Sequence, residues 1–305
     1  MRLDLALIER HPGLSRRKAR EAIEKGQVSV DGRMVREPGS LVASKAALVQ
    51  WDRDKKALPR VRPALPLLYE DDAVLVVDKP AGLLSVPTAP GADGEATALA
   101  HVREYVRRTN PRRPYVGLVH RLDRDTSGAL LFAKSPESRQ ALIALFARHG
   151  IERRYSALVA GRPREEEGIV DAPIKDAYEG GGRGVARGEE PSRPARTRWR
   201  VVERFARAAL LDLELETGRQ HQARIHLAHI GLPVLGDPRY GRATALPRKH
   251  PRRQMLHARR LALTHPLTGA RIEAESPLPE DFRAALRALR AEPAAPTRGP
   301  RPRRG

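Results

Sequence analysis

The sequence contains no cysteine, no long apolar run and few lysines. Without cysteine the chain can form neither disulfide bonds nor thiolate metal sites, which fits a reducing compartment such as the cytosol. The start Met1-Arg2-Leu3 lacks the apolar core of a signal peptide, and nowhere do about 18 apolar residues follow one another. We therefore expect a soluble, cytoplasmic protein with no membrane partner.

Basic residues are abundant although lysine is scarce. Lys and Arg number 57 against 37 Asp and Glu, which gives a formal net charge of +20, and most of the basic residues are Arg. A guanidinium group binds phosphate through two hydrogen bonds and stacks on bases, so this surplus predicts a nucleic-acid partner. A GC-rich genome would also favour Arg over Lys, but it would not explain the surplus of positive charge.

The first 52 residues show the pattern of a small separate module. Apolar spacing predicts a helix over residues 2–10, and Ser15 is placed to cap a second helix that ends near Gly26. The dipeptide Asp31-Gly32 predicts a type I′ hairpin over residues 27–35. This order resembles the small RNA-binding module named after ribosomal protein S-four. The resemblance implies that the basic outer face of the second helix contacts RNA, and a merely solvated face is the less favoured alternative. Its residues are Arg16, Arg17 and Arg20.

The chain is expected to divide into four segments. We expect the N-terminal module over residues 1–52, a proline-containing linker over 53–66, a larger domain over 67–291, and a disordered basic tail over 292–305. Residues 67–79 read as strand, turn and strand, with Lys79 as an edge charge without a catalytic role. A helix near 95–108 places Tyr105 in the core. Residues 176–195 lack the Gly-Lys-Ser/Thr of a phosphate loop and read as a surface loop, with Arg183 and Arg187 as its candidate RNA contacts.

The most informative stretch is residues 117–133, where an apolar strand, a charged turn and a second apolar strand predict a hairpin. His120, Arg121 and Asp123 lie in the turn, which Gly128 closes. Further along, residues 135–150 predict a helix capped by Ser135, and residues 153–161 predict a strand that contains Tyr155. Leu211, Leu213 and Leu215 alternate with acidic residues, which predicts a strand with one solvated side. Residues 255–275 predict another hairpin, and residues 280–290 a last helix.

The turn sequence His-Arg-Leu-Asp followed by Thr-Ser-Gly resembles the active-site motif of the RluA-type pseudouridine synthases. Segments 80–87, 153–161 and 217–241 resemble further motifs of that family in the expected order, and Ala223 stands where relatives commonly have Leu or Ile. The resemblance implies a catalytic role for Asp123, a Tyr155 ring against the target uracil, and an Arg224 that pairs with Asp123. It also implies RNA contacts by four residues: His120, Arg121, Arg219 and His221.

The implied reaction isomerises a uridine within RNA, so that the base is rejoined to the sugar through its carbon five. The product is an isomer of the substrate, so no cofactor is expected. A neighbouring arginine lowers a carboxylate pKa by about 1 to 3 units, so Arg224 would keep Asp123 charged, and its planar fork suggests a bidentate contact. Whether Asp123 attacks the sugar, attacks the base or deprotonates the sugar stays open. Flipping the base costs a few kcal/mol, which stacking on Tyr155 would offset.

Three alternatives compete with this interpretation. His221, His226 and His229 suggest a metal site, but their spacing does not place two ligands on one helical face and no carboxylate adjoins them. The second is a metal-dependent nuclease that uses Asp123 with Asp125. The third is a non-catalytic RNA-binding or ribosome-assembly protein. We favour a monomeric enzyme acting on large-subunit ribosomal RNA, with transfer RNA as the other candidate substrate. The expected fold is mixed α+β, with a largely antiparallel sheet bent around a cleft and helices packed outside.

Overall fold

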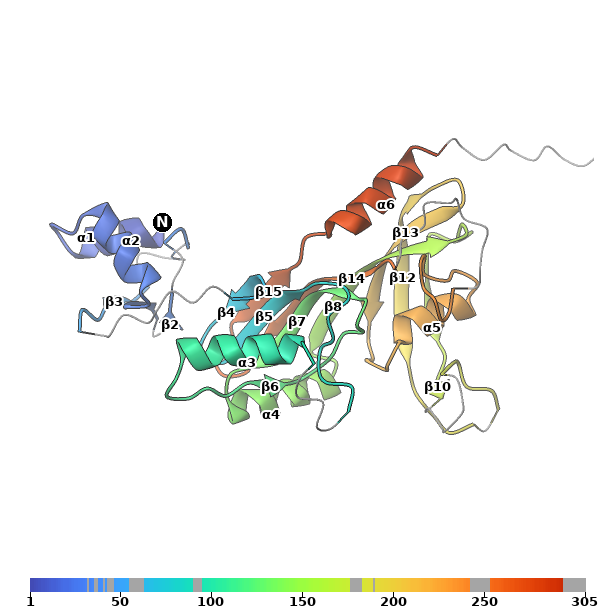
Figure 1. Ribbon diagram of the computed structural model, residues 1–305, viewed down its shortest axis with the longest axis horizontal. Coiled ribbons are helices and arrows are strands. Elements are labelled where there is room, and N and C mark those ends of the chain that lie inside the picture. Colours follow the sequence, from blue (N-terminus) through green and yellow to red (C-terminus); the bar gives the residue numbers. More distant parts are fainter. Residues whose placement is uncertain are drawn as a thin grey trace, which may run out of the picture.

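The structure is a computed structural model of the whole chain, and it describes residues 1–31, 33–35, 38–40, 42, 47–54, 63–89, 95–175, 183–188, 190–241 and 253–292. Within these residues the fold is mixed α+β, as predicted, with a small N-terminal unit and a large sheet flanked by helices (Figure 1). Most of the predicted linker, part of the 176–195 loop and most of the C-terminal tail fall outside the described residues.

The N-terminal unit has the predicted order of elements. Helices α1 (Leu3–Arg10) and α2 (Arg16–Glu24) precede β1 (Val28–Val30), β2 (Arg33–Met34) and β3 (Val49–Trp51), and the strand order is β2-β1-β3. Ser15 caps α2, because its side chain accepts a hydrogen bond from the backbone N–H of Lys18. The unit has its own apolar core, which includes Leu3, Leu7 and Ile23.

The large unit contains ten strands among the described residues, and their spatial order is β4-β5-β7-β14-β8-β13-β12-β9, with β15 beside β14 and β6 beside β7. The strand bounds are Leu67–Glu70 for β4, Val74–Lys79 for β5, Gly117–Leu118 for β6, Ser127–Ala133 for β7, Ile151–Ala160 for β8, Glu167–Asp171 for β9, Arg196–Arg204 for β12, Ala208–Leu215 for β13, Leu256–Thr264 for β14 and Arg271–Glu275 for β15. The pair β7 and β14 is parallel, and all the other pairs in this sheet are antiparallel. A further pair, β10 (Ile174–Lys175) and β11 (Ser192–Arg193), stands apart.

In the described part of this unit, four helices accompany the sheet: α3 (Ala98–Thr109), α4 (Pro136–Ala147), α5 (Gln222–His229) and α6 (Glu280–Arg290). Helix α3 packs against Leu75 and Phe132, whereas α4 packs against their neighbours Val76 and Leu131. Because successive strand residues point to opposite sides, the two helices cover opposite sides of β5 and β7. Tyr105 lies in the core, as predicted. None of the described helices has the length and apolar character needed to cross a membrane.

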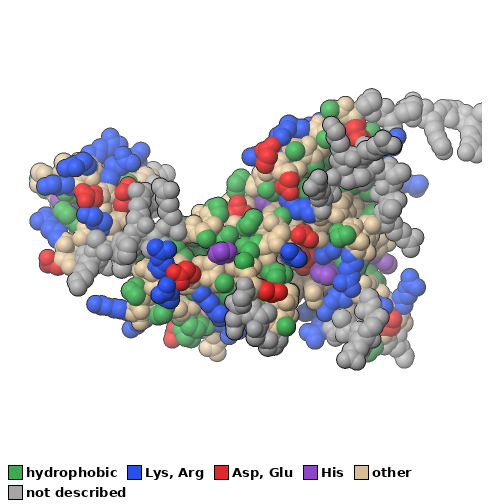
Figure 2. Space-filling view, viewed as in Figure 1, with side chains coloured by type: hydrophobic (Ala, Val, Ile, Leu, Met, Phe, Trp, Pro, Cys, Tyr) green, Lys and Arg blue, Asp and Glu red, His purple; other side chains and the backbone are tan. Residues whose placement is uncertain are grey.

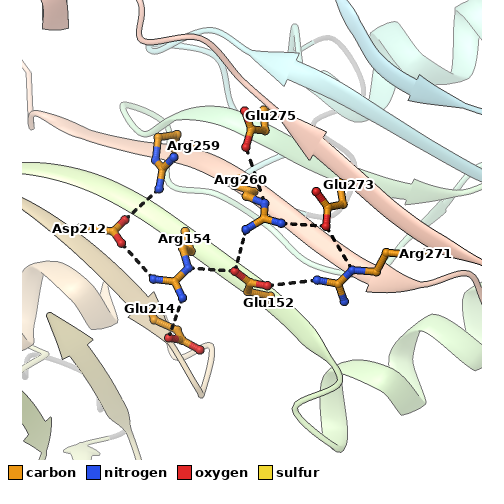
Figure 3. A network of polar contacts seen from close by, with 9 residues as sticks. All are labelled: Glu152, Arg154, Asp212, Glu214, Arg259, Arg260, Arg271, Glu273 and Glu275. Atoms are coloured by element: carbon orange, nitrogen blue, oxygen red, sulfur yellow. Dashed lines mark hydrogen bonds and ion pairs between the residues drawn. The ribbon is translucent and has the colours of Figure 1, made fainter. Parts of the chain in front are cut away.

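The alternation along β13 is confirmed, but the expected solvated side is wrong. Leu211, Leu213 and Leu215 belong to the main core, while Asp212 on the other side of the strand is only 8% exposed. A network of arginine–carboxylate pairs covers that side and extends across β13, β8, β14 and β15 (Figure 3). The acidic residues of β13 therefore face partners from neighbouring strands, which a single-strand pattern does not reveal.

Candidate active site

The predicted hairpin is confirmed: β6 and β7 pair antiparallel, and residues 119–126 form a loop between them. The loop backbone is fixed by Ser85, whose hydroxyl donates to the carbonyl of Leu122 and accepts from its N–H, at 2.7 and 3.0 Å. Gly128 follows the loop with φ of +118°, and a Cβ there would collide with the backbone of Ala258. A glycine is therefore required where β7 meets β14.

Lys79 is not the edge charge that the sequence suggested. Its side chain is fully buried, and its Nζ donates to the carbonyls of Pro80, Leu83 and Arg124 at 2.8 to 2.9 Å. Burial lowers the pKa of Lys79 to about 8, against the opposite effect of Asp125 and Asp123. Lys79 thus connects the segment after β5 to the loop that contains Asp123.

Asp123 and Arg224 meet as predicted, across 101 residues of sequence. Arg224 Nη1 donates to Asp123 Oδ2 at 3.0 Å, and the Asp123 side chain is 20% exposed. The predicted bidentate contact between them is wrong. The planar fork of Arg224 instead holds Asp237, through Nε to Oδ2 at 2.7 Å and Nη2 to Oδ1 at 2.9 Å. One guanidinium group therefore bridges two carboxylates.

The surroundings of Asp237 favour its charged form. Burial raises its pKa, but the hydrogen bonds from Arg224 and from the backbone N–H groups of Tyr240 and Arg239 outweigh burial, and the pKa is lowered below its usual value. Burial alone would likewise lower the pKa of Arg224, whereas the two aspartates raise it. Both partners consequently keep their charge, and Arg224 is held in one orientation toward Asp123.

The two oxygens of Asp123 differ in their surroundings. Oδ2 accepts from Arg224 and lies 3.5 Å from Gln254 Nε2, which also donates to Thr126. Oδ1 receives no hydrogen bond from the described residues, and His221 Nε2 lies 3.8 Å from it. Burial lowers the pKa of His221 although Asp123 raises it, so the ring is biased toward its neutral form. Oδ1 is therefore the oxygen of this carboxylate that is available to a ligand.

These groups line a cavity of about 520 Å³, a volume within the range of small-molecule sites. Tyr155, on β8, forms part of its wall, is 7% exposed, and has a pKa raised by burial. Arg121 is exposed at the cavity. His120 accepts a hydrogen bond from the N–H of Leu131 through Nε2 at 2.9 Å, and burial lowers its pKa to about 3. A neutral His120 thus fastens the loop to β7.

The structure separates the predicted site residues into two groups. Seven of them line the single cavity just described: His120, Arg121, Asp123, Tyr155, Arg219, His221 and Arg224. The other three, Arg16, Arg17 and Arg20, are exposed on α2 in the N-terminal unit, where Arg16 Nε contacts Asp4 Oδ2 at 3.3 Å. On the side shown in Figure 2, Lys and Arg side chains outnumber acidic ones over this unit.

Sequence reasoning missed three residues around the site. Asp237 orients Arg224, Gln254 contacts Asp123, and Arg153 lines the cavity beside Tyr155. Strand alternation places Arg153 on the same side of β8 as Tyr155, so a signal for it was present. Gln254 precedes a strand in an otherwise unremarkable stretch and carried no signal.

The histidines do not gather around a metal. His226 is fully buried, with Nδ1 at 2.9 Å from Thr197 Oγ1 and Nε2 at 2.9 Å from the carbonyl of Ala172. His221 Nδ1 lies 2.9 Å from the hydroxyl of Tyr240. In the described part of the chain, no three His, Cys, Asp or Glu residues are grouped so that they could hold a metal ion. The His226 contacts are structural.

The chain is similar to known proteins over nearly its whole length. Residues 73–229 match the family described as RNA pseudouridylate synthase, and residues 1–47 match the S4 domain. Two relatives named ribosomal large subunit pseudouridine synthase D cover most of the chain. The Xanthomonas campestris protein is 37% identical over 96% of this chain and 90% of its own length. The Pseudomonas aeruginosa protein is 38% identical over 95% and 92%.

Solved structures agree on the fold. The human protein RNA pseudouridylate synthase domain containing 4 superposes with a TM-score of 0.60, at 24% identity, over 75% of this chain and 94% of its own. Human RNA pseudouridylate synthase domain containing 1 superposes with a TM-score of 0.55, at 25% identity, over 76% and 97%.

Proposed function

Because the chain belongs to the RNA pseudouridylate synthase family and is an RNA-modifying isomerase, we propose that it acts on large-subunit ribosomal RNA with Asp123 as its catalytic carboxylate. The observation that carries the assignment of Asp123 is its contact with Arg224 at the wall of a cavity that also contains Tyr155. The curated relatives named for the large ribosomal subunit support the choice of RNA.

The reaction breaks the bond between the sugar and N1 of uracil and forms a bond between the sugar and C5, while a proton leaves C5 and N1 gains one. Asp123 must be ionised to assist as nucleophile or base, and Arg224 donates a hydrogen bond to its carboxylate. Oδ1 of Asp123 is the oxygen free to approach the nucleotide. Arg224 and Asp237 hold the carboxylate in place, so that its orientation does not depend on the substrate.

The remaining cavity residues fit the handling of a flipped uridine. The Tyr155 ring supplies an aromatic surface for the base, and stacking on such a surface offsets much of the cost of leaving the RNA stack. Arg121 is exposed at the cavity, where it fills the space that the flipped base leaves behind. Arg219 and His221 also line the cavity and contact the RNA. His120 keeps the loop in shape rather than transferring protons, since its pKa is about 3.

A direct test compares the unmodified protein with Asp123→Asn on ribosomal RNA labelled with tritium at C5 of uridine. Tritium release accompanies isomerisation, so we expect release by the unmodified protein and none by the variant, with RNA binding in filter assays within a few-fold. Residual activity near that of the unmodified protein would overturn the role of Asp123. Pseudouridine mapping with and without the gene tests the substrate separately: loss of a site from transfer RNA alone would overturn the ribosomal assignment.

The N-terminal unit, residues 1–52, supplies affinity for RNA in this proposal, through Arg16, Arg17 and Arg20 on α2. Binding through phosphates weakens with salt in proportion to the number of phosphates contacted. Deleting residues 1–52 should therefore raise KM several-fold and reduce the salt slope, while kcat on a short stem-loop changes little. Identical salt slopes with and without the unit would contradict its RNA role.

A further inference from the structure

Three arginines are buried in the described part of the chain, and Arg153 differs from the other two. Arg224 holds Asp237 bidentately, and Arg253 holds Asp281 in the same way, at 2.6 and 2.9 Å. Arg153, only 7% exposed on β8, has no carboxylate within 4.0 Å among the described residues. Within the described part of the molecule it is a buried cation without a counter-ion.

The few contacts of Arg153 leave part of its guanidinium unused. Nη2 donates to the carbonyl of Glu216 at 2.9 Å, and the group lies over the Phe146 ring with its carbon 5.4 Å from the centroid. Nε is buried and has no hydrogen-bond partner in the structure. A Cβ at Gly218 would lie 2.7 Å from Nη1, so the glycine leaves room for the guanidinium. Burial without a carboxylate lowers the pKa of Arg153, although arginine remains charged at neutral pH.

The cavity as a whole has an excess of positive charge. Among the described residues that line it, four are arginines and Asp123 is the only carboxylate. Arg224 is shared by Asp123 and Asp237, so the excess comes from the other three arginines. An uncompensated buried charge costs several kcal/mol, and that cost is relieved when an anion enters beside it. The unused hydrogen-bond donors and the uncompensated charge of Arg153 therefore indicate that its ligand group is anionic rather than neutral.

We propose that Arg153 binds a phosphodiester group flanking the target uridine and thereby fixes the depth at which the flipped nucleotide enters the cavity. The inference rests on the proposed function, because that function places RNA in this cavity. A phosphate carries a full negative charge and accepts two parallel hydrogen bonds from one guanidinium, whereas uracil is neutral and would leave the charge of Arg153 uncompensated. Arg153 and Tyr155 lie on the same side of β8, so one strand would hold both phosphate and base.

The test uses synthetic stem-loops in which one phosphate, on either side of the target uridine, is replaced by an uncharged methylphosphonate. The nucleotide before each replacement carries a 2′-O-methyl group for chemical stability, and the control RNA carries the same group next to a normal phosphate. Affinity is measured by fluorescence anisotropy with Asp123→Asn protein, so that no turnover is needed. Arg153→Gln is combined with each RNA, and the neighbouring Arg154→Gln serves as the matched control.

One of the two replacements should weaken binding about tenfold or more, as expected for a charge-assisted contact. Arg153→Gln should weaken binding of the control RNA to a similar extent and make the same replacement harmless, and Arg153→Lys should restore part of the loss. The phosphate contact is refuted if neither methylphosphonate weakens binding. It is also refuted if Arg153→Gln and the replacement together weaken binding by the product of their separate effects. If urea titrations show that Arg153→Gln does not fold, Arg153→Lys takes its place. A smaller loss from the phosphate replacement with Arg153→Lys than with Arg153 then supports the contact, and an equal loss refutes it. Turnover of unmodified RNA reports the proposed function independently.

Discussion

Arg153 and Arg154 are consecutive residues of β8, yet their guanidinium groups lie in opposite environments. Arg153 lines the cavity without an acidic partner, whereas Arg154 contacts Glu152, Asp212 and Glu214 at 2.9, 3.0 and 3.4 Å. The Arg154 side belongs to the network drawn in Figure 3, where each arginine has at least one carboxylate. On one side of β8 the arginines are thus neutralised by carboxylates, and on the other side Arg153 has none within 4.0 Å among the described residues.

Arginine therefore has different roles on the two sides of β8. A paired arginine on the network side joins strands and adds little net charge, so that side offers little attraction to phosphate. An unpaired arginine on the cavity side is costly for the fold and is useful only when a ligand supplies the counter-charge. Substitutions on the cavity side should therefore change activity more than stability, and substitutions on the network side should do the reverse.

The largest effect is expected at Arg224, which serves both the fold and the proposed chemistry. Arg224→Lys keeps the charge but cannot bridge Asp123 and Asp237 in one plane. A misplaced catalytic carboxylate slows a reaction about 100-fold, so the rate constant measured in single-turnover assays should fall by about 100-fold. Arg290→Lys is the control, because Arg290 holds Glu203 in a similar bidentate way on the surface. Equal rates for the two variants would remove the positioning role of Arg224.

On the network side, Arg154→Met should lower the unfolding free energy by about 1 to 3 kcal/mol. The variant leaves Asp212, which is 8% exposed, with Arg259 as its remaining arginine partner at 3.2 Å. Urea titrations would measure the loss, and kcat of the folded protein should stay unchanged. Arg271→Met, at the exposed rim of the network, should cost less than about 0.5 kcal/mol. A drop in kcat for Arg154→Met would erase the distinction between the two sides.

A further effect concerns the pH response of the cavity side. The pKa of His120 is about 3 in the fold, below its ordinary value near 6.5. Between these values the unfolded chain binds more protons at this residue than the folded chain does, so the unfolding free energy should rise with pH over that window. Above pH 6.5 the contribution is constant. His120→Gln should flatten the slope in urea titrations between pH 4 and 6.5, and an unchanged slope would show that His120 titrates normally.

Sequence and resemblance together predicted the elements and the meeting of Asp123 with Arg224, because local spacing and motif order carry that information. They missed what long-range packing decides. Nothing near Arg224 in sequence shows that its fork turns to Asp237 rather than to Asp123. Lys79 at the end of a strand has the appearance of a solvated charge, and only the fold encloses it. Asp212 alternates with leucines as surface residues do, yet arginines of neighbouring strands cover it.

The three hydrogen bonds of Lys79 determine when the active loop acquires its shape. Because the buried ammonium group holds the carbonyls of Pro80, Leu83 and Arg124, the loop becomes ordered together with the sheet, before any RNA arrives. Its conformational entropy is then lost during folding and not during association. Backbone amides around Asp123 should accordingly exchange with solvent as slowly as those of β7, and differences in rate among substrates should reflect how readily each RNA releases its uridine.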